Sequence, residues 1–457
     1  MKDRIKKFLN LIFPFIDFLY ILQLDEYYPK MYFKRIWRFY FRRDLQKRGN
    51  LKFTQRIKTT FSFSLVISLV IISVITFTLP LHLFFALPLG VLVSALMVPL
   101  SVGVANLLAT PIYNLIKRRI QNEARNIIQN QGKNTKIIAI AGSYGKTSTK
   151  NFIYQLIKSS YKVQIVPGNI NTPTGIAVWI NENFNPSTEF LIVEMDAYEI
   201  GEIAASCRIT PPDIAVLTVI GDQHTERFGK EENMRIALQE VFTKAKQGAY
   251  LITDKETKYK LSNDLKEKVK IIRETGDVRY KGNPLNTKGL SESKIKCLRY
   301  ALAVAEILNI PYRYVVHTVN NLEIPEQRQK ITKMMEYEGI DDSYNISFTT
   351  AMMGLKTARK EADKRGKRLL VITAGIPELS KENRYKNTKY GRALSRLSDR
   401  TIVLKSILAK DVIKGFSDKS KYILVPNMEH VTQLLKEKFS KDRWFILLQP
   451  ELTDLYY

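Results

Sequence analysis

Hydrophobic and polar residues divide this chain into a long uncharged block followed by short alternating elements. From Thr59 to Ile116 the sequence contains no Asp, Glu, Lys or Arg. A helix needs only about 20 apolar residues to span a bilayer, so this block is long enough for two. Pro80 and His82 indicate a hairpin tip, which predicts spans at about 60–79 and 83–106. The alternative, a buried hairpin in a soluble protein, fits a block of this length less well.

Basic residues flank the block on both sides: Lys52, Arg56 and Lys58 before it, and Lys117, Arg118 and Arg119 after it. The positive-inside rule then places both ends of the hairpin in the cytoplasm. Residues 7–43 mix aromatic and basic side chains, which is typical of helices that lie at the membrane surface. The pattern therefore predicts a multi-pass plasma-membrane protein whose domains outside the bilayer are cytoplasmic and whose partners include membrane lipids.

After Gly132 the pattern becomes that of an α/β protein. Apolar runs at 136–142, 189–196, 213–221 and 249–254 predict buried strands, and residues 148–160 have helical spacing. Alternation of strands and helices predicts a parallel sheet covered on both faces. A helix near 291–309 leads into a second α/β unit, which has strands at 367–375, 400–404 and 421–425 and helices near 348–365 and 383–398. The predicted division is 1–130 for the membrane helices, 131–325 for a central domain and 326–457 for a C-terminal domain.

Charge and cysteine content narrow the classes of partner. The chain of 457 residues has a formal net charge of +27, and residues 1–58 hold 15 Lys and Arg against 5 Asp and Glu. Because this excess lies beside an apolar block, it favours anionic lipid, and we predict no nucleic-acid partner. Two cysteines, Cys207 and Cys297, lie far apart without metal-ligand spacing, which favours reduced thiols in the cytosol.

The stretch KIIAIAGSYGKTSTKN, residues 136–151, has the order strand, glycine turn and helix that phosphate-binding loops use. Its turn is shorter than that of G-x-x-x-x-G-K-[ST], because Ile140 stands where the first glycine would be. Backbone N–H groups and Lys146 would bind the phosphates of ATP, and the Thr147 hydroxyl is placed for Mg²⁺. The candidate nucleotide-binding residues are Gly142, Ser143, Tyr144, Gly145, Lys146, Thr147 and Ser148.

Polar residues end the neighbouring predicted strands: Glu194 and Asp196 in one, Asp222 and His224 after another. Ligands of parallel α/β sheets bind beyond the carboxyl ends of the strands. A solvated carboxylate and a structural histidine are the ordinary interpretations of Glu194 and His224 taken singly. Together with the loop they favour an ATP–Mg²⁺ site, with Thr147, Glu194 and His224 as metal ligands and Lys146, Glu194 and His224 as catalytic residues.

Six segments, in order, resemble the Mur ligases, the ATP-dependent amide-bond-forming enzymes of peptidoglycan synthesis. They are AGSYGKTS (141–148), GNINTPTGIA (168–177), IVEMDAYEIGEI (192–203), PDIAVLTVIGDQHTERFG (212–229), EQRQKI…GIDDSYN (326–345) and TAGIPELSKENRYKNTKYGRAL (373–394). The resemblance covers residues 136–457. It implies a Mur-ligase-like P-loop ATPase domain followed by a Rossmann-like domain.

The resemblance also implies an activity and further site residues. The expected reaction adds D-alanyl-D-alanine or a similar amino-acid or dipeptide amine to a muropeptide carboxylate through an acyl-phosphate. Arg328 and Asp342 would contact the nucleotide, and His224 would help to bind a second Mg²⁺. Substrate contacts are expected from Asn169, Asn171, Thr172, Tyr344 and Asn345.

Several positions depart from the family pattern. Leu238 occupies the place of the family's carbamylated lysine, Lys294 and Cys297 replace asparagines that contact adenine, and Arg328 lacks the glycine expected before it. The family's UDP-sugar domain has no counterpart in residues 1–130, so the muropeptide could be lipid-linked rather than UDP-linked. Two alternatives stay open: an amide ligase for another polyanionic acceptor, and a nucleotide-binding membrane scaffold without ligase activity.

Overall fold

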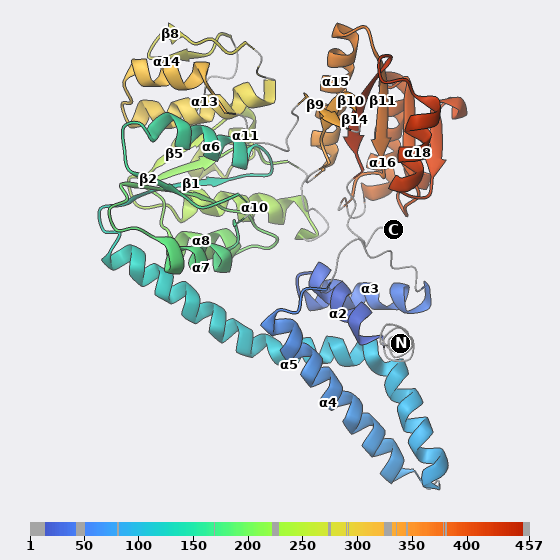
Figure 1. Cartoon of the computed structure of the whole chain (residues 1–457). Coiled ribbons are helices and arrows are strands. Elements are labelled where there is room, and N and C mark those ends of the chain that lie inside the picture. The colour runs from blue at the N-terminus through green and yellow to red at the C-terminus, as the bar shows by residue number, and fades with distance from the viewer. Residues whose placement is uncertain are drawn as a thin grey trace. The chain divides into compact units, whose positions relative to one another are not determined.

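The computed structural model describes residues 14–42, 51–79, 82–168, 170–221, 228–272, 276–288, 290, 292–323, 331–334, 336–343, 346–377, 379 and 382–450. The chain forms two compact units that divide between Arg118 and Arg119. The first unit is helical, and the second contains two six-stranded sheets (Figure 1).

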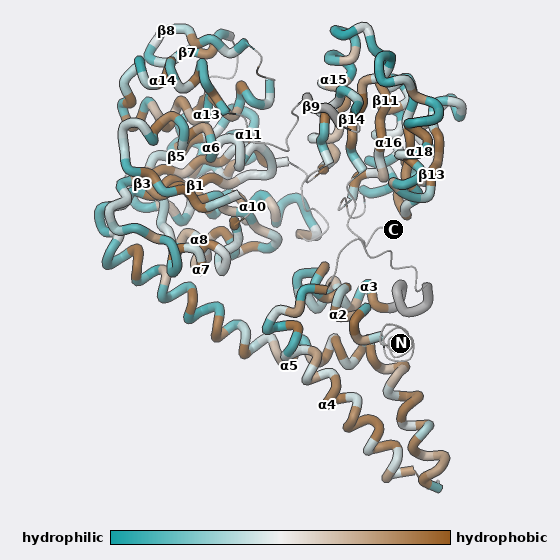
Figure 2. Tube along the Cα trace, in the orientation of Figure 1, coloured by the Kyte–Doolittle hydropathy of each residue, from teal (hydrophilic) through white to brown (hydrophobic). Residues whose placement is uncertain are grey.

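The helical unit consists of α2 (Phe15–Leu24), α3 (Pro29–Arg42), α4 (Gln55–Thr78) and the first part of α5 (Leu83–Asn130). Within the described residues, α4 and α5 are the two helices long and apolar enough to cross a membrane. Only 22% and 28% of their most apolar windows are buried, whereas the core helix of a soluble protein would be mostly buried. Figure 2 shows mainly apolar residues along α4 beyond its polar first turns and along the first half of α5.

Polar contacts join α3 and the turn before it to α4 and α5. The Tyr32 hydroxyl donates to the carbonyl of Pro99 at 2.7 Å, and the Asn106 side chain donates to the carbonyl of Tyr27 at 3.0 Å. Arg56, in the first turn of α4, donates to the Asn106 side chain at 3.1 Å and lies 4.1 Å from the Tyr27 ring centre. Arg56 therefore has a hydrogen-bond partner and an aromatic partner within this unit.

The central sheet is parallel, with strand order β2-β3-β1-β4-β5-β6. Its strands are β1 (Lys136–Ala141), β2 (Val163–Ile165), β3 (Phe190–Glu194), β4 (Ile214–Leu217), β5 (Tyr250–Thr253) and β6 (Val269–Ile271). Its helices are α6 (Lys146–Ile157), α7 (Pro173–Asn183), α8 (Glu202–Ile209), α10 (Glu231–Thr243), α11 (Lys255–Tyr259), α12 (Asn263–Lys266), α13 (Glu292–Ile307) and α14 (Tyr312–Asn320). A short hairpin, β7 (Arg279–Tyr280) and β8 (Asn283–Pro284), completes the domain.

Alternate residues of β1 enter two different cores, as the two-residue period of a strand requires. Ile137 and Ala139 pack with α7, α8 and α10, and Ile138 and Ile140 pack with α6, α13 and α14. These helices lie on opposite faces of the sheet (Figure 1). The end of α5 contributes Ala124 and Ile128 to the first of these cores.

The C-terminal sheet has strand order β13-β12-β11-β14-β10-β9, and only the edge strand β9 is antiparallel. Its strands are β9 (Ile331–Met334), β10 (Tyr337–Asp341), β11 (Arg368–Thr373), β12 (Arg400–Leu404), β13 (Tyr422–Val425) and β14 (Trp444–Gln449). Its helices are α15 (Phe348–Lys364), α16 (Asn383–Leu397), α17 (Ala409–Ile413), the 3-10 turn η2 (Lys419–Lys421) and α18 (Met428–Lys438).

Candidate nucleotide-binding site

The loop between β1 and α6 is shaped by two glycines. Gly142 has φ +133° and Gly145 has φ +79°, values that side chains disfavour. A Cβ on Gly142 would lie 2.2 Å from the Thr218 hydroxyl oxygen, so this glycine also permits close packing against β4. Two hydrogen bonds fix the turn: Ser143 N–H donates to the carbonyl of Val219 at 2.7 Å, and Gly221 N–H donates to Ser143 Oγ at 3.0 Å. The loop leads directly into α6, whose first residue is Lys146.

The Lys146 ammonium is buried and already paired. Its Nζ donates to the carbonyl of Gly142 at 2.6 Å and lies 3.2 Å from Asp196 Oδ2. Lys146 is 5% exposed and Asp196 is 8% exposed. The predicted phosphate-binding cation therefore has a carboxylate partner within its own domain.

Thr147, the second residue of α6, contacts Glu194 at the end of β3. The Thr147 hydroxyl donates to Glu194 Oε1 at 3.2 Å. Lys150, one turn further along α6, lies 3.3 Å from Glu194 Oε2 and also donates to the carbonyls of Val166 and Gly168. A hydroxyl and a carboxylate at hydrogen-bond distance form an oxygen donor set that suits Mg²⁺, so these residues fit the metal that the sequence resemblance implies.

The loop that follows β2 approaches Asp196, the carboxylate that pairs with Lys146. Asp196 N–H donates to the carbonyl of Asn171 at 3.0 Å, and the Asn171 side chain lies 3.5 Å from Asp196 Oδ2. Thr172 is the N-cap of α7, and its hydroxyl accepts from Gly175 N–H at 3.3 Å. Asn171 thus lies beside the Lys146–Asp196 pair, whereas the Thr172 side chain caps the first turn of α7.

Helix α13 supports the loop from behind. Lys294 Nζ donates to the Ser148 hydroxyl at 2.8 Å, and Cys297 Sγ lies 3.7 Å from the carbonyl of Gly145. Both residues are buried. The two positions that the resemblance aligns with adenine-contacting asparagines therefore contact the candidate loop at Gly145 and the first turn of α6 at Ser148.

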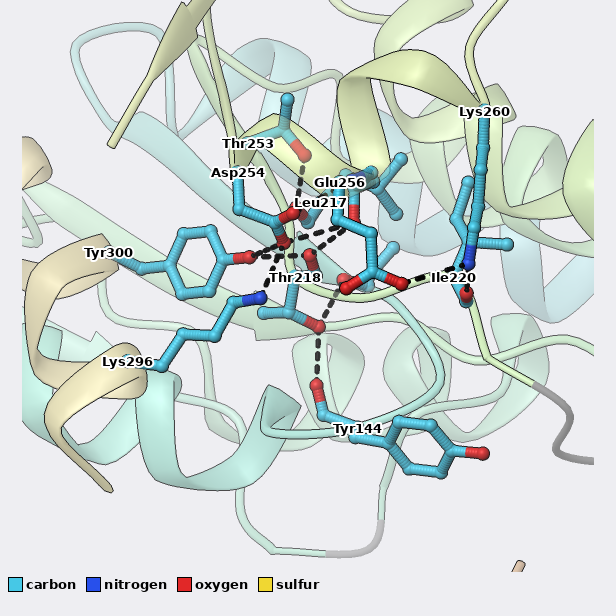
Figure 3. A network of polar contacts seen from close by, with 12 residues as sticks. Tyr144, Leu217, Thr218, Ile220, Thr253, Asp254, Glu256, Lys260, Lys296 and Tyr300 are labelled. Carbon is cyan, nitrogen blue, oxygen red and sulfur yellow. Dashed lines mark hydrogen bonds and ion pairs between the residues drawn. The ribbon is translucent and has the colours of Figure 1, made fainter. Parts of the chain in front are cut away.

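A second network holds the base of the loop (Figure 3). The Thr218 hydroxyl donates to the carbonyl of Tyr144 at 2.5 Å, and Tyr300 of α13 donates to the carbonyl of Thr218 at 2.5 Å. The Tyr300 hydroxyl also donates to Asp254, whose other partners include Lys296 at 3.2 Å and Thr257. This network couples the ends of β4 and β5 to the loop, and sequence analysis did not predict it.

His224, Asn169, Arg328, Tyr344 and Asn345 fall outside the described residues. Asp342 follows β10 in the C-terminal domain and accepts from the Gln449 side chain at 2.8 Å.

Two other residues bear on the predicted site. Leu238, at the family's carbamylated-lysine position, is 3% exposed within the apolar core beneath α10. Lys150 was missed by sequence analysis, although its position four residues after Lys146 places both lysines on one helix face.

Comparisons with known proteins agree with this geometry. Residues 140–297 match the family model of the Mur ligase middle domain. The UDP-N-acetylmuramoyl-tripeptide–D-alanyl-D-alanine ligase of Bacillus subtilis is 33% identical over 118 residues, 26% of each chain. The ligase of the same name from Buchnera aphidicola is 26% identical over 247 residues, 49% of this chain and 54% of that protein. The chain thus spans from a quarter to about half the length of these curated relatives.

Solved structures extend the likeness beyond the middle domain. The MurF ligase of Thermotoga maritima, in complex with ADP, has a TM-score of 0.60 at 22% identity, covering 73% of this chain and 80% of that chain. MurF of Acinetobacter baumannii has a TM-score of 0.62 at 19% identity, covering 73% and 77%. At such identities the likeness concerns the fold. The predicted α/β architecture is confirmed: this chain has the fold of the Mur ligases, and its residues 140–297 match their middle domain.

Proposed function

We propose that this protein is an ATP-dependent ligase that forms a C–N bond between a carboxylate and an amine. The observation that carries the proposal is the group formed by Lys146, Thr147 and Glu194 at the carboxyl ends of β1 and β3. A lysine at the first position of a helix, beside a hydroxyl–carboxylate pair, is suited to the phosphates and metal of ATP. The match of residues 140–297 to the Mur ligase middle domain supports this reading.

The proposed reaction has two steps. A carboxylate oxygen of the acceptor attacks the γ-phosphorus of ATP and ADP departs, which leaves an acyl-phosphate. The amine then attacks the acyl carbon, and inorganic phosphate and a proton are released. Lys146 and the loop N–H groups would bind the phosphoryl oxygens and neutralise charge on the transferring group. Thr147 and Glu194 would hold Mg²⁺, which supplies further neutralisation when it is bound.

For the substrates, we propose a muropeptide acceptor and D-alanyl-D-alanine or a similar amine. The names of the curated relatives support this choice. The acceptor's carrier is either UDP or a lipid. The lipid-linked form is supported by α4 and α5, which carry large exposed apolar residues such as Leu69, Phe77, Phe84 and Leu92.

We further propose that α4 and α5 anchor the protein in the plasma membrane and that the α/β domains are cytoplasmic. The three parts would then have separate roles. Residues 1–130 would anchor the protein in the membrane, residues 131–325 would bind ATP, and residues 326–457 would close over the nucleotide. The basic residues on both flanks of the apolar block support this orientation. We expect the full chain to partition into the detergent phase. We also expect it to be absent from the fraction that carbonate makes soluble.

The test is phosphate release from ATP by the full-length protein in detergent, with and without an amine. Release should require D-alanyl-D-alanine and a muropeptide, supplied in parallel as UDP-linked and lipid-linked forms. Mass spectrometry should detect a product heavier than the acceptor by the amine minus water. The matched variant, Lys146→Gln, keeps an N–H donor on the side chain but carries no charge.

One set of observations favours a second function. Leu238 cannot carry a carbamate, and Lys294 and Cys297 occupy positions where the family has asparagines. A scaffold that binds ATP without turnover would show nucleotide binding, yet equal background phosphate release from the wild type and Lys146→Gln. That result would overturn the ligase proposal.

A further inference from the structure

The charged cluster at the carboxyl ends of β1 and β3 contains one carboxylate without a role so far, Asp196. Four buried charged groups meet there: Lys146, Lys150, Glu194 and Asp196. They form two pairs, Lys150 with Glu194 at 3.3 Å and Lys146 with Asp196 at 3.2 Å. Glu194 is thus balanced by a lysine that also serves two backbone carbonyls. Asp196 instead pairs with the lysine that would bind phosphate.

Asp196 is fixed in place by the backbone around it. Its N–H donates to the carbonyl of Asn171 at 3.0 Å, and its Oδ1 accepts from Ala197 N–H at 3.0 Å. Neither bond involves Lys146, so displacement of Lys146 by a phosphate would not itself break them. The carboxylate is therefore held beside Lys146 by a contact other than the ion pair itself.

This arrangement penalises a nucleotide that arrives without a metal. The phosphates of free ATP would compete with Asp196 for Lys146 and would lie close to a buried carboxylate, where like charges repel strongly. A divalent cation removes the conflict, because it can accept oxygen ligands from the phosphates and from a carboxylate together. A loop lysine without an acidic partner would discriminate much less between the two forms.

From this geometry we infer that Asp196 is a positioning residue that makes nucleotide binding depend on a divalent cation. It occupies Lys146 in the empty site and admits ATP as the metal complex. The inference rests on the proposed ATP site but not on ligase turnover. It adds to the Thr147–Glu194 pair a second carboxylate whose charge faces the same phosphates.

The experiment measures binding of a fluorescent ATP analogue to the full-length protein in detergent, with excess MgCl₂ or excess EDTA. The variant is Asp196→Asn, which is isosteric and can still accept from Ala197 N–H. Relative to the wild type, affinity in EDTA should rise about tenfold or more, equivalent to about 1.4 kcal/mol, while affinity with Mg²⁺ stays equal or falls. The ratio of the two affinities should therefore shrink at least by that factor.

Asp213→Asn is the matched control. Asp213 also pairs with a lysine, Lys246, at 2.8 Å, but it precedes β4 and so lies at the opposite end of the sheet. It should leave the metal ratio unchanged. Asp196→Ser provides a second variant in case the asparagine destabilises the domain, and thermal unfolding reports whether each variant is folded.

The outcomes separate this inference from the proposed ligase activity. If Asp196→Asn and Asp196→Ser change binding equally with and without Mg²⁺, the carboxylate is only a structural partner of Lys146 and the inference is overturned. If the wild type binds no nucleotide in either condition, the ATP site and this inference both fail. A metal ratio that shrinks in both variants supports the inference even where amine-dependent phosphate release is absent.

Discussion

The two sheets of the α/β unit are alike at the amino ends of their central strands and different at the carboxyl ends. In the central sheet, Asp213 precedes β4 and accepts from Ile137 N–H of β1 at 2.8 Å. In the C-terminal sheet, Asp399 precedes β12 and accepts from Leu369 N–H of β11 at 2.7 Å. Each aspartate also pairs with a cation, Lys246 or Arg359, so the amino ends repeat one structural device.

At the carboxyl ends the chemistry diverges. The central sheet gathers the two lysine–carboxylate pairs of the nucleotide site there. The C-terminal sheet instead gathers mainly neutral groups: Tyr390 donates to Gln449 at 2.5 Å, and Gln449 donates to Asp342 at 2.8 Å. Tyr390 and Gln449 are fully buried.

The difference concerns buried charged groups, which gather at the carboxyl ends of the strands mainly in the central sheet. Buried ion pairs contribute little net stability, because desolvation offsets their attraction, and they are better explained by binding or catalysis. A network built mainly of hydroxyl and amide groups, with Asp342 as its one carboxylate, specifies packing at a smaller desolvation cost. We therefore expect the central cluster to control ligand affinity and the C-terminal network to control stability.

Lys146→Gln should have the largest effect. We expect nucleotide affinity with Mg²⁺ to fall by about 100-fold, since a charge-assisted contact to phosphate is replaced by a neutral one. Titration of the fluorescent analogue would measure it, and unfolding should remain cooperative. Equal affinity in the two proteins would show that the charged end of the central sheet is not the ligand site.

Gly391→Ala should have the largest effect on the C-terminal domain. A Cβ at this point of α16 would lie 1.9 Å from the carbonyl of Val412, so α16 and α17 would have to separate. We expect a loss of about 3 kcal/mol in the free energy of unfolding, measured by denaturant titration. Gly168→Ala, where a Cβ would meet nothing within 4 Å, is the control and should be nearly neutral.

Gln449→Leu tests the neutral network itself. The substitution removes the acceptor for Tyr390 and the donor to Asp342, so it should cost about 2 kcal/mol of stability. Gln433→Leu, on the exposed face of α18, should change stability by no more than about 0.5 kcal/mol. A large loss of nucleotide affinity without loss of stability would contradict the assignment of this network to packing.

The sequence predicted the strands better than the contacts. Apolar runs such as 136–142 and 400–404 correspond closely to β1 and β12, because buried parallel strands are continuously apolar. The loop was recognisable because phosphate binding imposes local spacing. In contrast, the run that forms β14 was not assigned, although it is central to its sheet.

Side-chain pairing at the site depends on residues far apart in sequence. The Lys146–Asp196 and Lys294–Ser148 contacts join segments 50 and 146 residues apart, so they are set by how the strands and helices pack. No local pattern specifies which lysine meets which carboxylate. The same limit applies to Thr218, whose bond to Tyr144 requires β4 to lie beside β1.

Asp399→Asn should change the free energy of unfolding least of these variants. The change should appear mainly in how that free energy depends on pH. Partial burial raises the pKa of Asp399, but the hydrogen bonds from Leu369 N–H and Arg359 outweigh it, so the folded-state pKa lies below the ordinary value. Stability from this carboxylate is therefore present above about pH 4, the unfolded-state pKa, and is lost as pH falls through the folded-state value.

The free energy of unfolding of Asp399→Asn should depend less steeply on pH in this acid range. Arg359→Gln should flatten it in the same direction, and the double variant should add little to either, because both remove one interaction. Nucleotide affinity should be unchanged in all three. A change in affinity would mean that charges at the amino ends of the strands also serve the ligand, which would break the contrast between the two ends of the sheets.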